Sequence, residues 1–148
     1  MNDTITINLV RDYVHRKLAD TQFVQELIKK MEKENKLANY KHIELDICGC
    51  RVGYPATPQF IDYFLNHLSK QNGEKTLIVK MNAIANFEWI FLNLLVLEGD
   101  FFAINDKINS EEDVIKSKEL INKKLEQTKI AFNVIVSNGE KYKYGNQE

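Results

Sequence analysis

The change of hydrophobic period between residues 43 and 64 constrains the fold of this chain most. Ile43, Leu45 and Ile47 alternate with polar residues, which predicts a strand with one buried face. Beyond Pro58 the apolar residues recur every three or four positions, as Phe60, Ile61, Phe64, Leu65 and Leu68. That spacing predicts an amphipathic helix ending near residues 72–73. A strand that leads directly into such a helix is typical of an α/β fold.

The junction between this strand and this helix contains both prolines of the chain, Pro55 and Pro58. Thr57 stands where an N-cap is expected and Pro58 where the first helical residue is expected. We therefore expect the free N–H groups and the positive dipole end of the helix to face the loop 53–56. Such a helix start can hold an anion, a phosphorylated hydroxyl or an acidic group of a partner.

The rest of the chain continues the alternation of strand and helix patterns. We expect strands at 4–10, 41–50, 76–80 and 100–105, and helices at 20–34, 87–97 and from Ser110 onward. Asn138-Gly139 between two alternating runs predicts a closing hairpin over about 130–145. The sequence thus predicts a single α/β domain over residues 1–148, with a mixed sheet backed by helices and a C-terminal β-hairpin. The nearly all-apolar strand 76–80 predicts a sheet covered on both faces.

Composition excludes several classes of function. The chain has 148 residues, 44% of them hydrophobic, which suits one soluble domain with its own core. Its net charge of −1 gives no field that would attract nucleic acid. The start does not read as a secretion signal, and the apolar run 87–97 is too short to cross a bilayer. We therefore expect a cytoplasmic protein without a membrane or nucleic-acid partner, whose two cysteines stay reduced.

The helix predicted at 87–97 has almost no polar side, because it contains Trp89, Phe91 and a run of aliphatic residues. Such a helix must be covered all round. Either it lies under the C-terminal hairpin, or it leaves an apolar stripe for a second copy of the chain. A homodimer is therefore one of the two interpretations of this segment.

Three short segments resemble the STAS-like family, related to the sulphate-transporter and anti-sigma-factor-antagonist domain. They are the opening Ile5-Thr-Ile followed by Arg16, the strand Ile43–Asp46 with its glycine-bearing turn, and the helix near Phe60. The resemblance covers about the first two thirds of the chain. It implies a mixed sheet backed by helices, a regulatory role without chemistry, and an ATP-binding partner of the histidine-kinase ATPase type. In anti-sigma antagonists an Asp-Ser pair precedes the corresponding helix and the serine is phosphorylated; Ala56-Thr57 keeps only the hydroxyl.

No catalytic or metal-binding pattern is recognisable. Cys48 and Cys50 are predicted on one face of the strand as small hydrophobic residues, and two thiols do not make a zinc site. His15, His42 and His67 lack ligand spacing, and no nucleophile elbow or phosphate-binding glycine loop occurs. The polar residues Asp62, Tyr63, Asn66 and His67 are interpreted as neighbours on a solvated helix face. We therefore predict that the chain is not an enzyme and binds no cofactor or metal.

These observations predict a non-catalytic regulatory module that docks a protein partner through the strand-to-helix loop. The expected contact or phosphorylation residues are Arg51, Gly53, Tyr54, Ala56 and Thr57. A purely structural reading of Thr57 needs only a helix cap worth about 1 kcal/mol. The alternative is a small-ligand binding protein or an enzyme that holds a phosphate or nucleotide at the same helix N-terminus. A deep polar pocket at the loop would favour this alternative.

Overall fold

The structure, a computed structural model, describes residues 3–14, 17–53, 56–83 and 110–145. The strands are β1 (Thr4–Asn8), β2 (Lys17–Leu18), β3 (His42–Asp46), β4 (Arg51–Val52), β5 (Lys75–Met81), β6 (Ile130–Val136) and β7 (Lys141–Tyr144). The helices are α1 (Leu9–Tyr13), α2 (Thr21–Lys33), α3 (Ala56–Ser69) and α5 (Glu111–Thr128). The helix predicted at 87–97 and the strand predicted at 100–105 lie outside the described residues.

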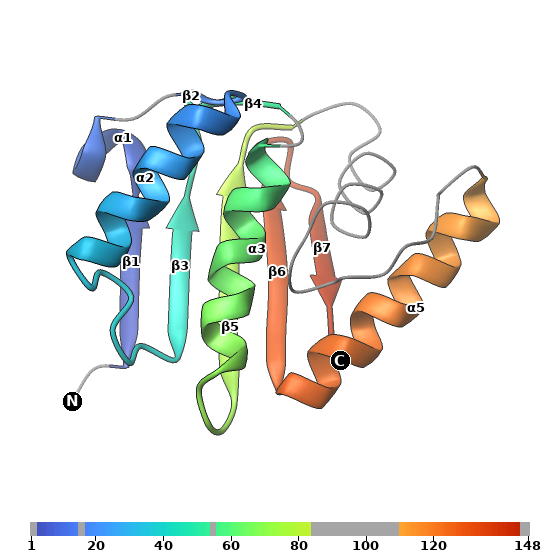
Figure 1. The fold of residues 1–148 in the computed structure, drawn as a ribbon. Coiled ribbons are helices and arrows are strands. Elements are labelled where there is room, and N and C mark those ends of the chain that lie inside the picture. The colour runs from blue at the N-terminus through green and yellow to red at the C-terminus, as the bar shows by residue number, and fades with distance from the viewer. Residues whose placement is uncertain (1–2, 15–16, 54–55, 84–109, 146–148) are drawn as a thin grey trace.

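A five-stranded sheet in the order β1-β3-β5-β6-β7 forms the centre of the fold (Figure 1). The first four strands pair in parallel, and β7 pairs antiparallel with β6 through the predicted hairpin. Strands β2 and β4 form a separate parallel pair beyond the carboxyl ends of β1 and β3 (Figure 1). The prediction of an α/β fold with a mixed sheet backed by helices and a C-terminal β-hairpin is confirmed.

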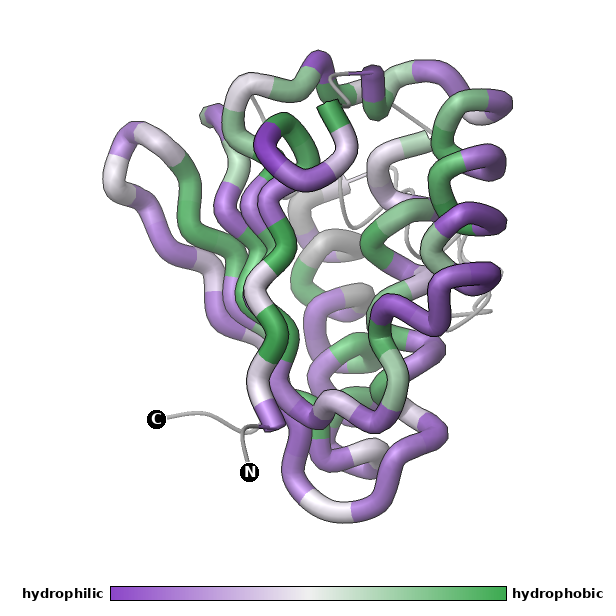
Figure 2. Tube along the Cα trace, turned by 90° about the vertical axis from the view of Figure 1, so that its left-hand side faces the viewer, coloured by the Kyte–Doolittle hydropathy of each residue, from purple (hydrophilic) through white to green (hydrophobic). Residues whose placement is uncertain are grey.

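Helices α2, α3 and α5 lie on one face of this sheet (Figure 2). The reason is the strand order: β1, β3, β5 and β6 are added in one direction, so right-handed connections place these three helices on the same side. Thr76, Ile78 and Lys80 of β5 point to the opposite face, where they are only half-buried. Within the described residues, the prediction of a sheet covered by helices on both faces is wrong.

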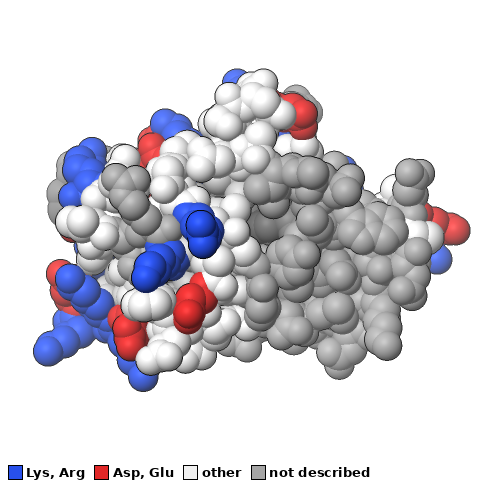
Figure 3. All heavy atoms as spheres, turned by 90° about the horizontal axis from the view of Figure 1, so that it is seen from above, with Lys and Arg blue, Asp and Glu red and all other residues white. Residues whose placement is uncertain are grey.

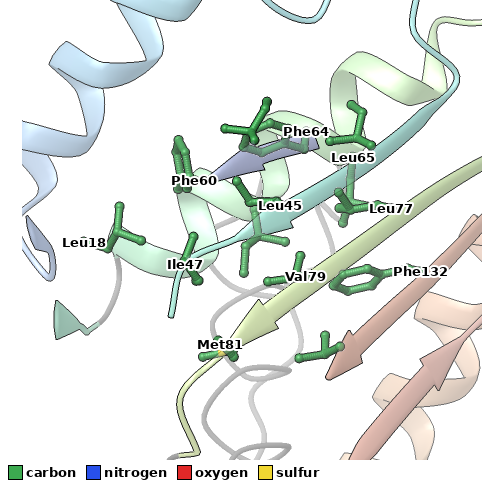
Figure 4. Close-up of a cluster of buried hydrophobic side chains, with 14 of the residues drawn as sticks. Leu18, Leu45, Ile47, Phe60, Phe64, Leu65, Leu77, Val79, Met81 and Phe132 are labelled. Carbon is green, nitrogen blue, oxygen red and sulfur yellow. The ribbon is translucent and has the colours of Figure 1, made fainter. Parts of the chain in front are cut away.

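The helix-covered face holds the core. All five residues of the predicted α3 stripe are fully buried, and they pack against apolar side chains of the sheet (Figure 4). Phe60 and Phe64 meet edge to face, with ring centroids 5.0 Å apart. On the same face, toward the β7 edge of the sheet, Phe132 stacks on Tyr144 of β7, with ring centroids 5.5 Å apart. The hairpin is thereby tied to the same core.

Element boundaries depart from the predictions at the end of β3. This strand stops at Asp46, whose carboxylate accepts the Cys48 N–H at 2.9 Å, and Gly49 follows with a φ of +85°. Cys48 is exposed in the turn, whereas Cys50 is buried. The prediction that the two cysteines share one face of a strand is therefore wrong, because a side-chain-stabilised turn separates them.

The helix predicted at 20–34 is confirmed as α2. Its N-cap is Asp20, whose carboxylate accepts the N–H groups of Gln22 and Phe23 at 2.9 and 3.4 Å. Val24, Leu27 and Met31 form its buried stripe. Among the described helices, none is both long enough and apolar enough to cross a membrane.

Candidate functional site

The β2–β4 pair brings together the loops that follow β1 and β3. Their register sets Lys17 beside Arg51 and Leu18 beside Val52. Helix α3 starts four residues after Val52 and packs against β2. In open α/β sheets, ligands and partners meet the protein at this carboxyl end. The predicted site residues that the structure describes, Arg51, Gly53, Ala56 and Thr57, thus lie at the end of the fold where ligands bind in open α/β sheets.

Thr57 connects the loop that follows β1 to the loop that follows β3. Its hydroxyl donates to the Leu18 carbonyl at 2.7 Å and accepts the Gly53 N–H at 3.0 Å. The residue is 4% exposed and lies within the first turn of α3, which begins at Ala56. The predictions that Thr57 is the N-cap and that its hydroxyl is displayed to a partner are wrong, because β2 covers it.

Gly53 is needed at its position because the two loops approach closely there. A Cβ atom on Gly53 would lie 2.8 Å from the Cβ of Ala19 and 3.2 Å from its Cα, so any side chain forces the loops apart. The glycine and Thr57 together fix the spacing between the segment after β2 and the start of α3.

The backbone N–H groups described at the start of α3 are not free to bind a ligand. The Thr57 N–H donates to the Gly53 carbonyl at 2.9 Å, and Pro55 and Pro58 have no N–H to offer. Ala56 is fully buried. The expectation that this helix start displays its N–H groups to an anion is therefore wrong for the residues described.

The exposed part of the site is an open groove of about 620 Å³, hereafter the carboxyl-end groove. It is lined by residues of both loops and the start of α2: Lys17, Ala19, Asp20, Phe23, Gly49 and Arg51. Phe23 is 39% exposed, and the Lys17 ammonium lies 4.8 Å from its ring centroid. Arg51 is exposed, whereas Tyr54 lies outside the described residues. Over the described part of this end, acidic and basic side chains are interspersed (Figure 3).

A second hollow, of about 720 Å³, separates α2 from α3 on the outside of the helix layer. Asp62, Tyr63 and His67 line it from α3. Asp62 is only 4% exposed, so the prediction of a solvated face is wrong for this residue. Its place three residues before Leu65, at the border of the apolar stripe, was the available signal.

Burial shifts the titration of the other groups in this second hollow. It raises the pKa of Tyr63 to about 12, with a smaller contribution from Glu32. It lowers the pKa of His67, although the hydrogen bond of His67 Nε2 with the Ala38 carbonyl at 3.0 Å opposes this. Both side chains are therefore uncharged near pH 7, so Tyr63 and His67 present neutral hydrogen-bonding groups to the hollow.

The described residues contain no group of three histidine, cysteine or acidic side chains placed to hold a metal ion. The His42 imidazole instead bonds the Thr76 hydroxyl at 2.9 Å. Burial, followed by Asp46, raises the pKa of the exposed Cys48 thiol, which lowers its reactivity near neutral pH. Comparisons with protein-family models, with curated proteins and with solved structures give no match for this chain.

Proposed function

We propose that the chain is a non-catalytic regulatory module of STAS-like type that docks a protein partner in the carboxyl-end groove. The observation that carries the proposal is the exposed Phe23 ring with Lys17 over it, in a groove that Arg51 also lines. Exposed aromatic and arginine side chains are the residue types that interfaces favour. We place the module in the cytoplasm.

The groove chemistry defines the partner segment. An apolar side chain that covers Phe23 would displace water from the ring, and acidic side chains beside it would meet Lys17 and Arg51. The resemblance adds a candidate source for that segment, an ATP-binding partner of the histidine-kinase ATPase type. The partner is thus expected to offer an acidic segment with at least one large apolar residue.

Thr57 acts in this proposal as a positioning residue. Its hydroxyl links Leu18 of β2 to Gly53 beyond β4, so it holds the two walls that carry Lys17 and Arg51. Phosphorylation of this hydroxyl would require the loop to open, because the group is buried and bonded. The proposal therefore rests on the shape of the groove and not on a modification at Thr57.

The small-ligand alternative has less support. A phosphate needs donors aimed at one point, and the Thr57 and Gly53 N–H groups already have partners within the chain. The groove at this end is open and contains an exposed aromatic ring. These features suit the side chains of a protein better than a small anion.

The test starts from partners that the wild-type chain captures from the source organism and that mass spectrometry identifies. Binding of the purified partner is then measured for Arg51→Glu and Phe23→Ser. We expect each change to weaken binding at least about tenfold, because each removes a central contact of the groove. Lys33→Glu, at an exposed position near the far end of α2, is the control with the same charge change as Arg51→Glu.

A second pair of variants separates positioning from contact. Thr57→Ser keeps a hydroxyl and should bind as the wild type, whereas Thr57→Val should weaken binding only as far as it loosens the loop. If the Arg51 and Phe23 variants bind the partner as tightly as the wild type while remaining folded, the groove is the wrong surface.

A further inference from the structure

The face of the sheet opposite the helices carries an ordered pattern of charge. Strand register places Glu44, Ile78, Asn133 and Lys143 in one row across β3, β5, β6 and β7. The next row contains Asp46, Lys80, Ile135 and Lys141. Both rows extend to uncharged residues of the edge strand β1, Thr6 and Asn8, then carry an acid on β3, and end with a lysine on β7.

Contacts within the sheet confirm that these side chains share this face. The Glu44 carboxylate pairs with the Lys80 ammonium at 2.5 Å. Phe132 stacks on Tyr144 on the helix side, so the alternating residues Lys141 and Lys143 must point the other way. Lys141 and Lys143 are exposed, and no described carboxylate pairs with either.

The charges are separated across the face. Lys80 offsets one of the two acids on β3, which leaves that side with one net negative charge, and β7 has two positive charges. Ile78 and Ile135 lie between them, half-buried, on the two middle strands. Asn133 and Lys80 lie beside them on the same two strands, so the centre of the face combines apolar and polar side chains within charged borders.

We propose that this face binds a second copy of the chain, related by a twofold axis that runs along the strands between β5 and β6. Such an axis lays β3 of one copy over β7 of the other. Because the axis runs along the strands, each row faces the same row of the second copy. Glu44 then faces Lys143 of the second copy and Asp46 faces its Lys141. Each contact occurs twice, as in any isologous interface.

A second copy fits this face better than an arbitrary partner because the pattern is complementary to itself. The acids on β3 and the lysines on β7 lie at equal distances from the proposed axis, because β5 separates β3 from the axis and β6 separates β7 from it. Ile78 and Ile135 lie next to the axis, so their counterparts in the second copy come close to them. A twofold axis across the strands would instead place β3 over β3 and set acid against acid.

The experiment uses sedimentation equilibrium of the full chain at low salt, where the wild type is expected at twice the 17.3 kDa of one chain. One variant reverses the β7 side, with Lys141→Glu and Lys143→Glu. The other reverses the β3 side, with Glu44→Lys, Asp46→Lys and Lys80→Glu, which keeps an ion pair between positions 44 and 80. Alone, each variant carries like charges on both sides, and we expect its dimer to weaken at least about tenfold.

Mixing the two variants provides the decisive measurement, because every charge contact is then complementary again. We expect a one-to-one heterodimer, detected by native mass spectrometry, whose affinity approaches that of the wild-type dimer and falls with added salt. The control variant Lys29→Glu and Lys33→Glu has the charge change of the β7 variant on exposed positions of α2 and should dimerise as the wild type does. Circular dichroism establishes that every variant is folded.

Three results would overturn the proposal. The wild type could remain monomeric at about 100 µM and low salt, a concentration at which even a weak specific dimer forms. Both charge-reversed variants could dimerise like the wild type, which would place the interface elsewhere. The mixture could also fail to form the heterodimer although both variants are folded. If the β3 variant does not fold, loss of the dimer in the β7 variant and its restoration by Glu44→Lys with Lys80→Glu decide the question.

Discussion

The two faces of the central sheet differ in what they bury. On the helix side, Leu45, Leu77, Val79 and Phe132 are fully buried under α3 and α5. On the other side, residues of the same strands are half-buried, and charged or polar groups outnumber the apolar ones. The free energy of folding therefore comes mainly from one face, since apolar burial contributes about 25 cal/mol for each Å² removed from water.

This difference shows which positions can evolve for binding without loss of stability. A side chain on the helix face is fixed by its packing, whereas a side chain on the open face can change with little effect on the core. In the carboxyl-end groove, Arg51 and Phe23 are exposed and can change with little effect on the core, whereas Thr57 is buried and fixed by its contacts. Substitutions on the two faces should accordingly differ in stability by several kcal/mol.

The largest expected contrast is between Phe132→Ala on the helix face and Ile135→Ala on the open face. Phe132 is fully buried and stacks on Tyr144, so its truncation should cost about 3–5 kcal/mol. Ile135 is half-buried, and its truncation should cost only about 1–2 kcal/mol. Urea unfolding followed by circular dichroism, in dilute protein and high salt to exclude self-association, measures both. Equal losses would mean that the open face is covered and that the comparison is mistaken.

The next effect concerns the close approach of Gly53 to Ala19. Gly53→Ala should destabilise the fold by about 1–3 kcal/mol, because the new methyl group would lie 2.8 Å from the Ala19 Cβ. Ala19→Gly removes the opposing Cβ, so the double variant should recover a large part of the loss. The double-mutant cycle, measured by urea unfolding, must therefore give a favourable coupling between the two positions; additive losses would exclude this contact as the cause.

A loss of similar size is expected for Thr57→Val. The substitution preserves shape but leaves the Leu18 carbonyl and the Gly53 N–H without their partner, which costs about 1–3 kcal/mol for buried groups. Thr57→Ser should lose less than half as much. Thermal unfolding of the pair distinguishes the hydrogen bonds from the methyl packing. A serine variant as unstable as the valine variant would assign the role of Thr57 to its methyl group.

The sequence sufficed where a local pattern determines the structure. The α3 stripe from Phe60 to Leu68 and the hairpin at Asn138-Gly139 were both predicted correctly, because a period and a turn type are readable over a few residues. The N-cap of α2 at Asp20 is equally local. These elements supply two of the five strands of the sheet and two of the described helices that cover it.

Several of the errors originate in distant contacts. Whether Thr57 is a cap or a buried link depends on the Leu18 carbonyl, which lies 39 positions away in the chain. Likewise, the apolar run Leu77, Ile78 and Val79 does not reveal that the described helices α2, α3 and α5 lie on one side, because that follows from strand order. The carboxyl-end groove was only half predicted for the same reason: Arg51 was named, but Lys17 comes from β2 and Phe23 from the start of α2.

The smallest expected effect is that of Glu44→Gln on the open face. The Lys80 and Glu44 side chains are 42% and 31% exposed, so water already screens the ion pair and its loss should cost no more than about 1 kcal/mol.

Glu44 raises the pKa of Lys80, so this contribution is complete at neutral pH. It is lost only as the pH rises past the ordinary lysine pKa toward the raised one, because the folded state then holds a proton that the unfolded state has released. Urea unfolding at pH 7 and pH 11, in dilute protein and high salt to exclude self-association, should show the small loss at pH 7 and a smaller one at pH 11. A loss comparable to that of Phe132→Ala would show that the charged face contributes to folding as strongly as the core does, and the distinction between the two faces would fail.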